Sequence, residues 1–215
     1  CLPRMVADCK LVIVECAARM AGMFKRCFPG VTVYGTLKET GVQWPKDHKL
    51  DATIHISALG RFYLNKDSDF ERKAYITPDP KRLEKWLDWL EQFPKPWNGI
   101  AWKGGIQATQ THIRSMELPE MAPVINGGSW FDLSYHDSAR ELSLWNIEHE
   151  TQIVKPPIDT RDYDDTIAFI AALDTVTTVT TTVAHVCGAL GKKARVLVPD
   201  VAQWRYAYRF DDGTQ

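Results

Sequence analysis

The stretch DDTIAFIAALDTVTTVTTTVAHVCGALGKKARVLVP, residues 164–199, decides the fold class of this chain. It reads in turn as helix, strand, helix and strand, with TVTTV (175–179) and ARVLVP (194–199) as the strands. Two strands joined through a helix form a βαβ unit, and the crossover makes these strands parallel. The stretch therefore predicts a mostly parallel sheet flanked by helices.

The same alternation of strands and helices extends over the rest of the second half of the chain. Further strands are expected at GIAW (99–102), WFDLSY (130–135) and TQIV (151–154), with helices at about 117–125 and 137–149. Together with the opening stretch, these segments predict a second Rossmann-like domain with five strands.

The first half has a weaker version of this pattern. Strands are expected at LVIVEC (11–16), VTVYG (31–35) and ATIHIS (52–57), with a helix between the first two. An amphipathic helix begins at Pro80 and ends before Pro94. The proline-rich exit FPKPWNG predicts the domain boundary, which gives an N-terminal Rossmann-like domain at 1–93 and a C-terminal one at 94–215.

The bulk properties are those of an ordinary soluble globular protein. Of the 215 residues, 45% are hydrophobic and 25% are charged, and the net charge is −1. This balance gives no general attraction to nucleic acid, and no apolar run approaches the ~20 residues of a membrane span. The five cysteines are scattered, which favours free thiols in a reducing, cytoplasmic setting, and the histidine and cysteine spacing predicts no metal site.

In an open parallel sheet, ligands bind beyond the carboxyl ends of the strands. The sequence Lys103-Gly104-Gly105 follows the strand at 99–102, and Thr180, Thr181 and Thr182 follow the strand at 175–179. Glycine amides, hydroxyls and lysine suit a phosphate group.

Both loops also have a simpler interpretation. Gly-Gly is neither a dinucleotide fingerprint nor a Walker loop, so spacing alone favours a solvated loop at 103–105. Strand formation and helix capping explain the threonines as well as phosphate binding does, and a lone helical histidine such as His185 is more often a packed residue than a catalyst.

Four segments together carry a resemblance to a known family. They are GIAWKGG (99–105), HIRSMEL (112–118), WFDLSYHD (130–137) and the run from DDTIAF through VAQWRY (164–206). In this combination the chain resembles glycosyltransferase family 9, the heptosyltransferase-like proteins, in the branch often fused to tetratricopeptide repeats. The resemblance is strong from about 94 to 208 and weaker in the first half.

The resemblance implies two Rossmann-like domains of the GT-B type, a nucleotide-sugar donor bound mainly by the second domain, and no metal or other cofactor. It implies a phosphate-side group of residues and a nucleoside-side group. The phosphate side comprises Lys103, Gly104, Gly105, Arg114, Ser115, Thr180, Thr181, Thr182 and His185. The nucleoside side comprises Tyr135 and His136.

The chain also departs from the family pattern. The glycine-rich loop and the proposed catalytic aspartate of the family lie upstream of the helix that resembles LPRM (2–5), so we expect the catalytic base outside this chain and an incomplete N-terminal domain within a larger protein. Many heptosyltransferases also have an acidic residue where Thr180 stands.

The leading hypothesis is therefore a metal-independent glycosyltransferase, with a glycan, a lipid-linked sugar or a protein as acceptor and a tetratricopeptide domain as a possible fused or separate partner. The alternative is a non-catalytic module derived from such an enzyme, which either binds a nucleotide or sugar or acts as a scaffold. A nicotinamide dehydrogenase is disfavoured because no G-x-G-x-x-G motif is present.

Overall fold

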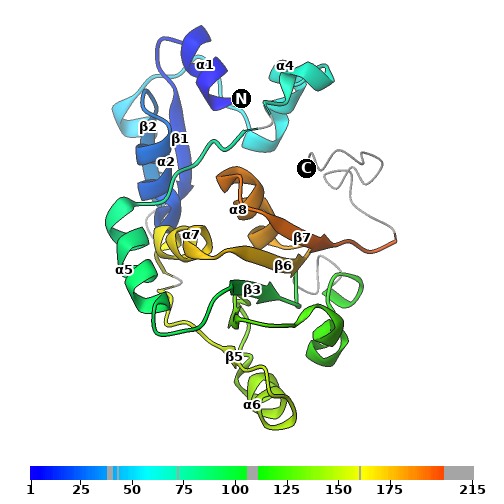
Figure 1. Cartoon of the computed structure of the whole chain (residues 1–215). Helices are drawn as coiled ribbons and strands as arrows, with labels where there is room; N and C mark the ends of the chain where they lie inside the picture. The colour runs from blue at the N-terminus through cyan, green and yellow to red at the C-terminus, as the bar shows by residue number, and fades with distance from the viewer. Residues whose placement is uncertain (38–40, 43, 72, 106–110, 160, 201–215) are drawn as a thin grey trace. The chain divides into compact units, whose positions relative to one another are not determined.

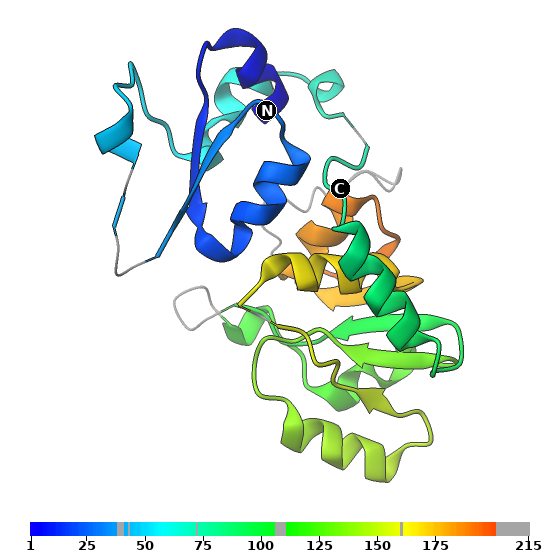
Figure 2. The ribbon, with the colours of Figure 1, turned by 90° about the vertical axis from the view of Figure 1, so that its left-hand side faces the viewer.

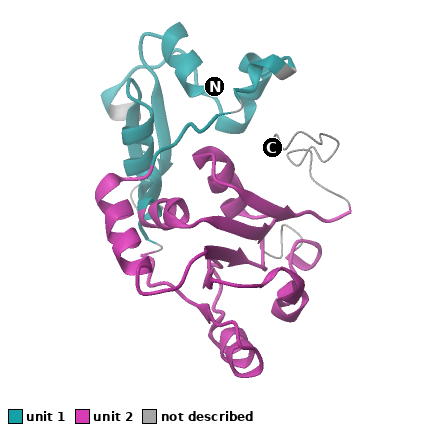
Figure 3. Cartoon of the chain, viewed as in Figure 1, with its two compact units in different colours: residues 1–77, 161–164 teal, residues 78–160, 165–215 magenta. Residues whose placement is uncertain are grey.

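The computed structural model describes residues 1–37, 41–42, 44–71, 73–105, 111–159 and 161–200 (Figure 1). The chain forms two compact units (Figure 3), of which unit 1 comprises residues 1–77 and 161–164 and unit 2 comprises 78–160 and 165–215. Both contain parallel strands accompanied by helices, which confirms the predicted α/β fold class. No helix in the described ranges is long and apolar enough to cross a membrane.

Unit 1 is built on two parallel strands. β1 (Ile13–Ala17) pairs with β2 (Thr32–Thr36) along its whole length. The crossover between them consists of η1 (Ala18–Met20) and α2 (Ala21–Cys27). The remaining elements are α1 (Leu2–Asp8), α3 (Trp44–Asp47), η2 (Ile56–Ala58), α4 (Gly60–Tyr63) and η3 (Asp67–Asp69).

The strand predicted at 52–57 is wrong. Residues 52–55 form no strand and Ile56–Ala58 form the short 3₁₀ turn η2. Ile54 and Ile56 are 40% and 53% exposed, so the alternation that suggested a strand has no core to cover. The His55 side chain instead accepts a hydrogen bond from the Ser57 amide at 3.4 Å, which favours the turn.

Within unit 1, Arg26 holds the segment 161–164. Its guanidinium donates to both carboxylate oxygens of Asp164, at 3.0 and 2.6 Å, and to the carbonyl of Thr77. A Cβ on Gly22 would lie 2.6 Å from Asp164 Oδ2, so glycine leaves the room that this ion pair needs. Asp164 is thus a structural anchor, as expected for a carboxylate at a helix start.

Unit 2 contains a five-stranded parallel sheet in the order β5-β4-β3-β6-β7. All five predicted strands are present, and β6 has the predicted bounds. The strands are β3 (Trp97–Ala101), β4 (Ser129–Asp132), β5 (Ile153–Val154), β6 (Thr175–Val179) and β7 (Ala194–Leu197). The helical elements are α5 (Pro80–Leu90), η5 (Thr111–Ile113), η6 (Leu118–Val124), α6 (Ala139–Glu148), α7 (Tyr163–Ala172) and α8 (Thr182–Leu190).

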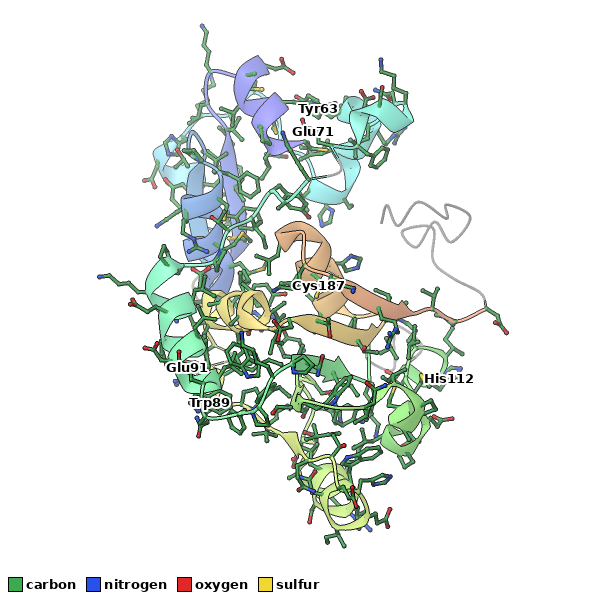
Figure 4. The ribbon with its side chains drawn as sticks, in the orientation of Figure 1. Tyr63, Glu71, Trp89, Glu91, His112 and Cys187 are labelled. Carbon is green, nitrogen blue, oxygen red and sulfur yellow. The ribbon has the colours of Figure 1, made fainter. Side chains whose placement is uncertain are left out.

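Each face of this sheet has its own core. On one face, α5 and α7 lie side by side (Figures 1 and 2), and the rings of Trp86, Trp89 (labelled in Figure 4), Phe131 and Phe169 contact one another. On the other face, η6 and α6 cover a cluster around Ile100, Trp102, Trp130, Trp145 and Ile153. Strand alternation explains this division, because successive side chains point to opposite faces.

Helix α5 belongs to unit 2, whereas the predicted boundary at 93/94 placed it in the first domain. Its Trp86 is 1% exposed, packs on Phe169 with ring centres 4.9 Å apart, and donates to Asp165 Oδ1 at 2.9 Å. The apolar stripe of this helix therefore faces the second sheet, and the proline-rich segment after it is a loop inside that unit.

The element predicted at 117–125 is the 3₁₀ helix η6 and not an α-helix. Pro123 lies inside it, and proline has no amide hydrogen to donate to the preceding turn.

Candidate functional site

The strand order creates a topological switch point between β3 and β6. From β3 the chain continues through β4 to β5 on one side, and from β6 it continues to β7 on the other. The two connections leave in opposite directions, and a crevice forms at the carboxyl ends of such a strand pair. The segments that follow these two ends are 102–105 and 180–182, which contain six of the nine residues predicted on the phosphate side.

Gly104 is where the two segments touch. A Cβ at this position would lie 2.6 Å from Thr181 Cγ2 and 3.3 Å from the carbonyl oxygen of Arg114. The amide of Gly104 donates to Ser115 Oγ at 3.1 Å. The structure thus brings Gly104, Arg114, Ser115 and Thr181 together as the sequence predicted, and only glycine permits this approach.

Arg114 supplies the positive charge at the switch point. Its guanidinium donates to the carbonyl oxygen of Thr180 and lies 3.3 Å from Thr180 Oγ1. No carboxylate of the described residues lies within ion-pair distance of this guanidinium, and its remaining N–H groups have no partner among them. A half-buried cation of this kind favours an anion as its ligand.

The sequence left open whether Thr180, Thr181 and Thr182 have a structural role or contact phosphate. Thr181 is the N-cap of α8, and its Oγ1 accepts from the Val183 amide at 3.1 Å. Thr180 is buried with 3% exposed, whereas Thr182 is exposed at the first position of α8. Thr181 therefore caps the helix. The amide groups of the first turn that it leaves uncapped, with the positive end of the helix dipole, suit a phosphate.

His185 is exposed one turn further along α8. Cys187 (labelled in Figure 4) is buried on the same helix, and burial raises the pKa of its thiol to about 12, so it is an inert core residue.

The ammonium group of Lys103 is paired with two carboxylates. Its Nζ lies 2.9 Å from Glu141 Oε1 and 3.6 Å from Glu117 Oε2, and Trp102 Nε1 donates to Glu141 Oε2 at 2.6 Å. The hydrogen bond that Lys103 donates to Glu141 is the main cause that raises the pKa of Lys103. Burial acts to raise the pKa of Glu141, but the hydrogen bonds from Lys103 and Trp102 outweigh it and lower that pKa.

Tyr135 and His136 lie on the loop after β4. Tyr135 is 48% exposed, and the His136 ring meets the Trp102 ring edge-on with centres 5.6 Å apart. His136 Nε2 is 3.3 Å from Glu141 Oε1, although their geometry makes no hydrogen bond. This loop therefore borders the Lys103–Glu141 pair at the same edge of the sheet.

Sequence reasoning missed Asp132 and Lys155. Asp132 ends β4 with 1% of its surface exposed, and Lys155 follows β5 and donates to Asp132 Oδ2 at 2.8 Å. An acidic residue inside the apolar run WFDL was the signal in the sequence, because a buried carboxylate needs a partner.

Part of the predicted site cannot be placed. Residues 106–110 and 201–215, which include part of the predicted phosphate loop and the WRY segment, lie outside the described residues.

Other features of the described residues do not add to the site. An apolar groove of about 350 Å³ lies in unit 1, and its lining does not suit a phosphate; it is lined by Leu2, Pro3, Val6, Cys27, Phe28 and Pro29. His112 (labelled in Figure 4) is exposed on η5, and no group of three metal-ligating side chains converges within the described ranges.

Among sequences, no family model matches the chain. It is 28% identical over 187 residues to Protein FlbA of Caulobacter vibrioides, an alignment that covers 80% of this chain and 31% of FlbA. The chain thus spans less than a third of the length of this curated relative.

Among solved structures, the chain is similar to POFUT1. A crystal structure of POFUT1 in complex with GDP-fucose matches 63% of this chain and 51% of its own with a TM-score of 0.44 and 12% identity. A structure of POFUT1 in complex with GDP matches 82% of this chain and 58% of its own with a TM-score of 0.43 and 10% identity.

Proposed function

We propose that unit 2 binds the diphosphate of a nucleotide-sugar donor at the switch point, and that the protein transfers the sugar to an acceptor hydroxyl. The observation that carries this proposal is the juxtaposition of Arg114, the close approach at Gly104 and the N-terminus of α8. Arg114 and the N-terminus of α8 favour an anion, and the close approach at Gly104 brings the segments after β3 and β6 together beside them. The family resemblance of the same segments favours a nucleotide-sugar as that anion.

In the proposed reaction, the acceptor oxygen forms a bond to the anomeric carbon as the bond from that carbon to the phosphate oxygen breaks. The electron pair of the broken bond stays on the departing nucleoside diphosphate, and a base takes the proton of the acceptor hydroxyl. Arg114 and the first-turn amides of α8 would stabilise the charge that develops on the diphosphate. We assign no catalytic base within this chain.

Between the two predicted cations, the geometry favours Arg114 as the main contact to phosphate. Lys103 already pairs with Glu141 and Glu117, so a donor would have to compete with two carboxylates for it. Direct contact of Lys103 with phosphate stays a prediction, as does contact of His185.

Calorimetric titration with a panel of UDP-, GDP- and ADP-sugars, including GDP-fucose, tests the proposal. The wild-type chain should bind at least one donor. Arg114→Met should weaken that binding about 10- to 100-fold, the effect of losing a charged hydrogen bond. Lys103→Met is the matched control and should change affinity less than Arg114→Met. No binding by the wild type to any donor would refute the proposal.

The second candidate is a binding module without turnover. Glu141 pairs with Lys103 of the predicted phosphate loop, and it already accepts hydrogen bonds from Trp102 and Lys103, which makes it a poor base. Donor binding that is not followed by release of free nucleoside diphosphate, in assays that contain candidate acceptors, would favour this candidate.

A further inference from the structure

One buried carboxylate ties down both ends of the loop after β4. Asp132 Oδ1 accepts from the amide of Ser134 at 2.6 Å, and Oδ2 accepts from Ser138 Oγ at 2.5 Å. Tyr135 and His136 lie between these two ties. The conformation of the segment that carries them therefore depends on Asp132.

Lys155, which directly follows the neighbouring strand β5, also holds this loop, and we call the Asp132–Lys155 pair the clamp. Its Nζ donates to Asp132 Oδ2 at 2.8 Å and to the carbonyl oxygen of Ser134. The peptide groups of Ser134 are thus held on one side by the carboxylate and on the other by the ammonium. Since the Asp132 side chain is fully buried, its charge needs this counter-charge, and the edge strand β5 delivers it.

The far side of the loop is also constrained. His136 packs edge-on against Trp102, and Trp102 is fully buried and fixed by its hydrogen bond to Glu141. The loop is therefore preorganised from both sides, by the Asp132–Lys155 pair at its base and by Trp102 at its middle. Preorganisation lowers the entropy cost of ordering a binding loop.

We infer that Asp132 and Lys155 are positioning residues for the nucleoside side of the donor site. They hold the loop 133–138 so that Tyr135 and His136 present a fixed surface to the nucleoside. This inference rests on the proposed function. It separates the site into two parts, because the diphosphate contacts at Arg114 and α8 do not involve the clamp.

The test is a comparison of two ligands on the same variants. Calorimetry would measure inorganic pyrophosphate and the tightest-binding member of UDP, GDP and ADP. Lys155→Met should weaken the nucleoside diphosphate about tenfold, the size of one lost ordered contact, and leave pyrophosphate within about twofold. Lys155→Arg should restore most of the loss. Lys193→Met, an exposed lysine just before β7, is the matched control and should change neither affinity.

The outcomes separate this inference from the proposed function. If the wild type binds neither ligand, the proposed function fails and the inference fails with it. If the wild type binds both and Lys155→Met weakens both equally, or neither, only the inference is overturned.

A second variant covers the case in which Lys155→Met does not fold by circular dichroism. Ser138→Ala keeps the ion pair and removes only the far tie of the loop. It should weaken the nucleoside diphosphate more than pyrophosphate, as Lys155→Met does, but by a smaller factor. Amide hydrogen exchange should become faster only in residues 133–138. Equal weakening of both ligands, or an unchanged exchange rate, would overturn the inference.

Discussion

The carboxyl edge of the unit 2 sheet has two parts that treat charge in opposite ways. At the switch point, Arg114 donates to the carbonyl of Thr180 and meets no carboxylate of the described residues. Beside β4, Lys103 and Lys155 are each paired with a carboxylate, Glu141 and Asp132. Arg114 thus has no carboxylate partner among the described residues, whereas Lys103 and Lys155 are both neutralised within the protein.

This difference shows that residue type does not assign a role at a binding edge. Lys103 and Arg114 were both predicted to contact phosphate, yet Lys103 is paired with Glu141 and Glu117, whereas Arg114 has no carboxylate partner among the described residues. The partners of a cation decide whether its charge is available. The following predictions test the two parts separately.

The largest expected effect is on the stability of the loop after β4, which Asp132 and Lys155 hold. Asp132→Ala would leave the Ser134 amide and the Ser138 hydroxyl without their acceptor in a buried setting. We expect the free energy of unfolding to fall by about 2–4 kcal/mol in urea denaturation. Glu148→Ala, an exposed position at the end of α6, should stay within about 0.5 kcal/mol. A loss below about 1 kcal/mol for Asp132→Ala would contradict the clamp.

A smaller effect is expected at the switch point. The added Cβ of Gly104→Ala would meet the methyl group of Thr181, whose hydroxyl is fixed by Thr178 and the Val183 amide. We expect a loss of about 1–3 kcal/mol in the same assay, typical of overpacking. Gly60→Ala is the control because its Cβ would make only an ordinary contact with Leu64, 3.7 Å away. Equal stability of the two variants would argue against the close approach.

The smallest effect is the coupling between Lys103 and Glu141. Both side chains are about a quarter exposed, so solvent screens their attraction. A double-mutant cycle with Lys103→Met and Glu141→Gln should give a coupling of about 0.5–1 kcal/mol near neutral pH. A coupling near zero would show that Lys103 is available to a ligand after all, and would remove the contrast with Arg114.

The pH dependence of this coupling has a definite sign. The folded-state pKa of Glu141 is lowered, so its contribution is present above the ordinary glutamate pKa of 4.5 and is lost as the pH falls through the folded-state pKa. The folded-state pKa of Lys103 is raised, so its contribution is present below 10.5 and is lost as the pH rises through the folded value. Urea denaturation from pH 3 to pH 8 checks the acid side.

Much of unit 2 was predictable because its sequence pattern matches its burial. The TVTTV strand sits at its predicted bounds because its even and odd positions are both covered, and Gly191 ends α8 in the left-handed conformation that favours glycine. In contrast, ATIHIS in unit 1 alternates like a strand but has exposed isoleucines. Local alternation cannot reveal whether a partner surface exists.

The placement of the candidate residues was predictable at the ends of β3 and β6, and less so for the ion pairs that flank β4. Loop chemistry after β3 and β6 pointed to Gly104 and Thr180–Thr182, since strand ends of a parallel sheet gather at one edge. The pairing of Lys103 with Glu141 and of Asp132 with Lys155 joins residues 38 and 23 positions apart. Such pairs depend on helix and strand placement, which composition and spacing do not encode.

The order of the strands also affects when the site forms during folding. Asn98 on β3 and Thr175 on β6 are register partners 77 positions apart, while β3, β4 and β5 follow one another closely along the chain. Because the segment between these strands is long, its closure costs entropy, and we expect this pairing to form later than the more local pairings of β3 with β4 and of β4 with β5. A ligand that contacts the ends of both β3 and β6 would stabilise only molecules in which this pair has formed. In a refolding experiment, we therefore expect ligand binding to recover when β3 and β6 pair, later than the helix content does.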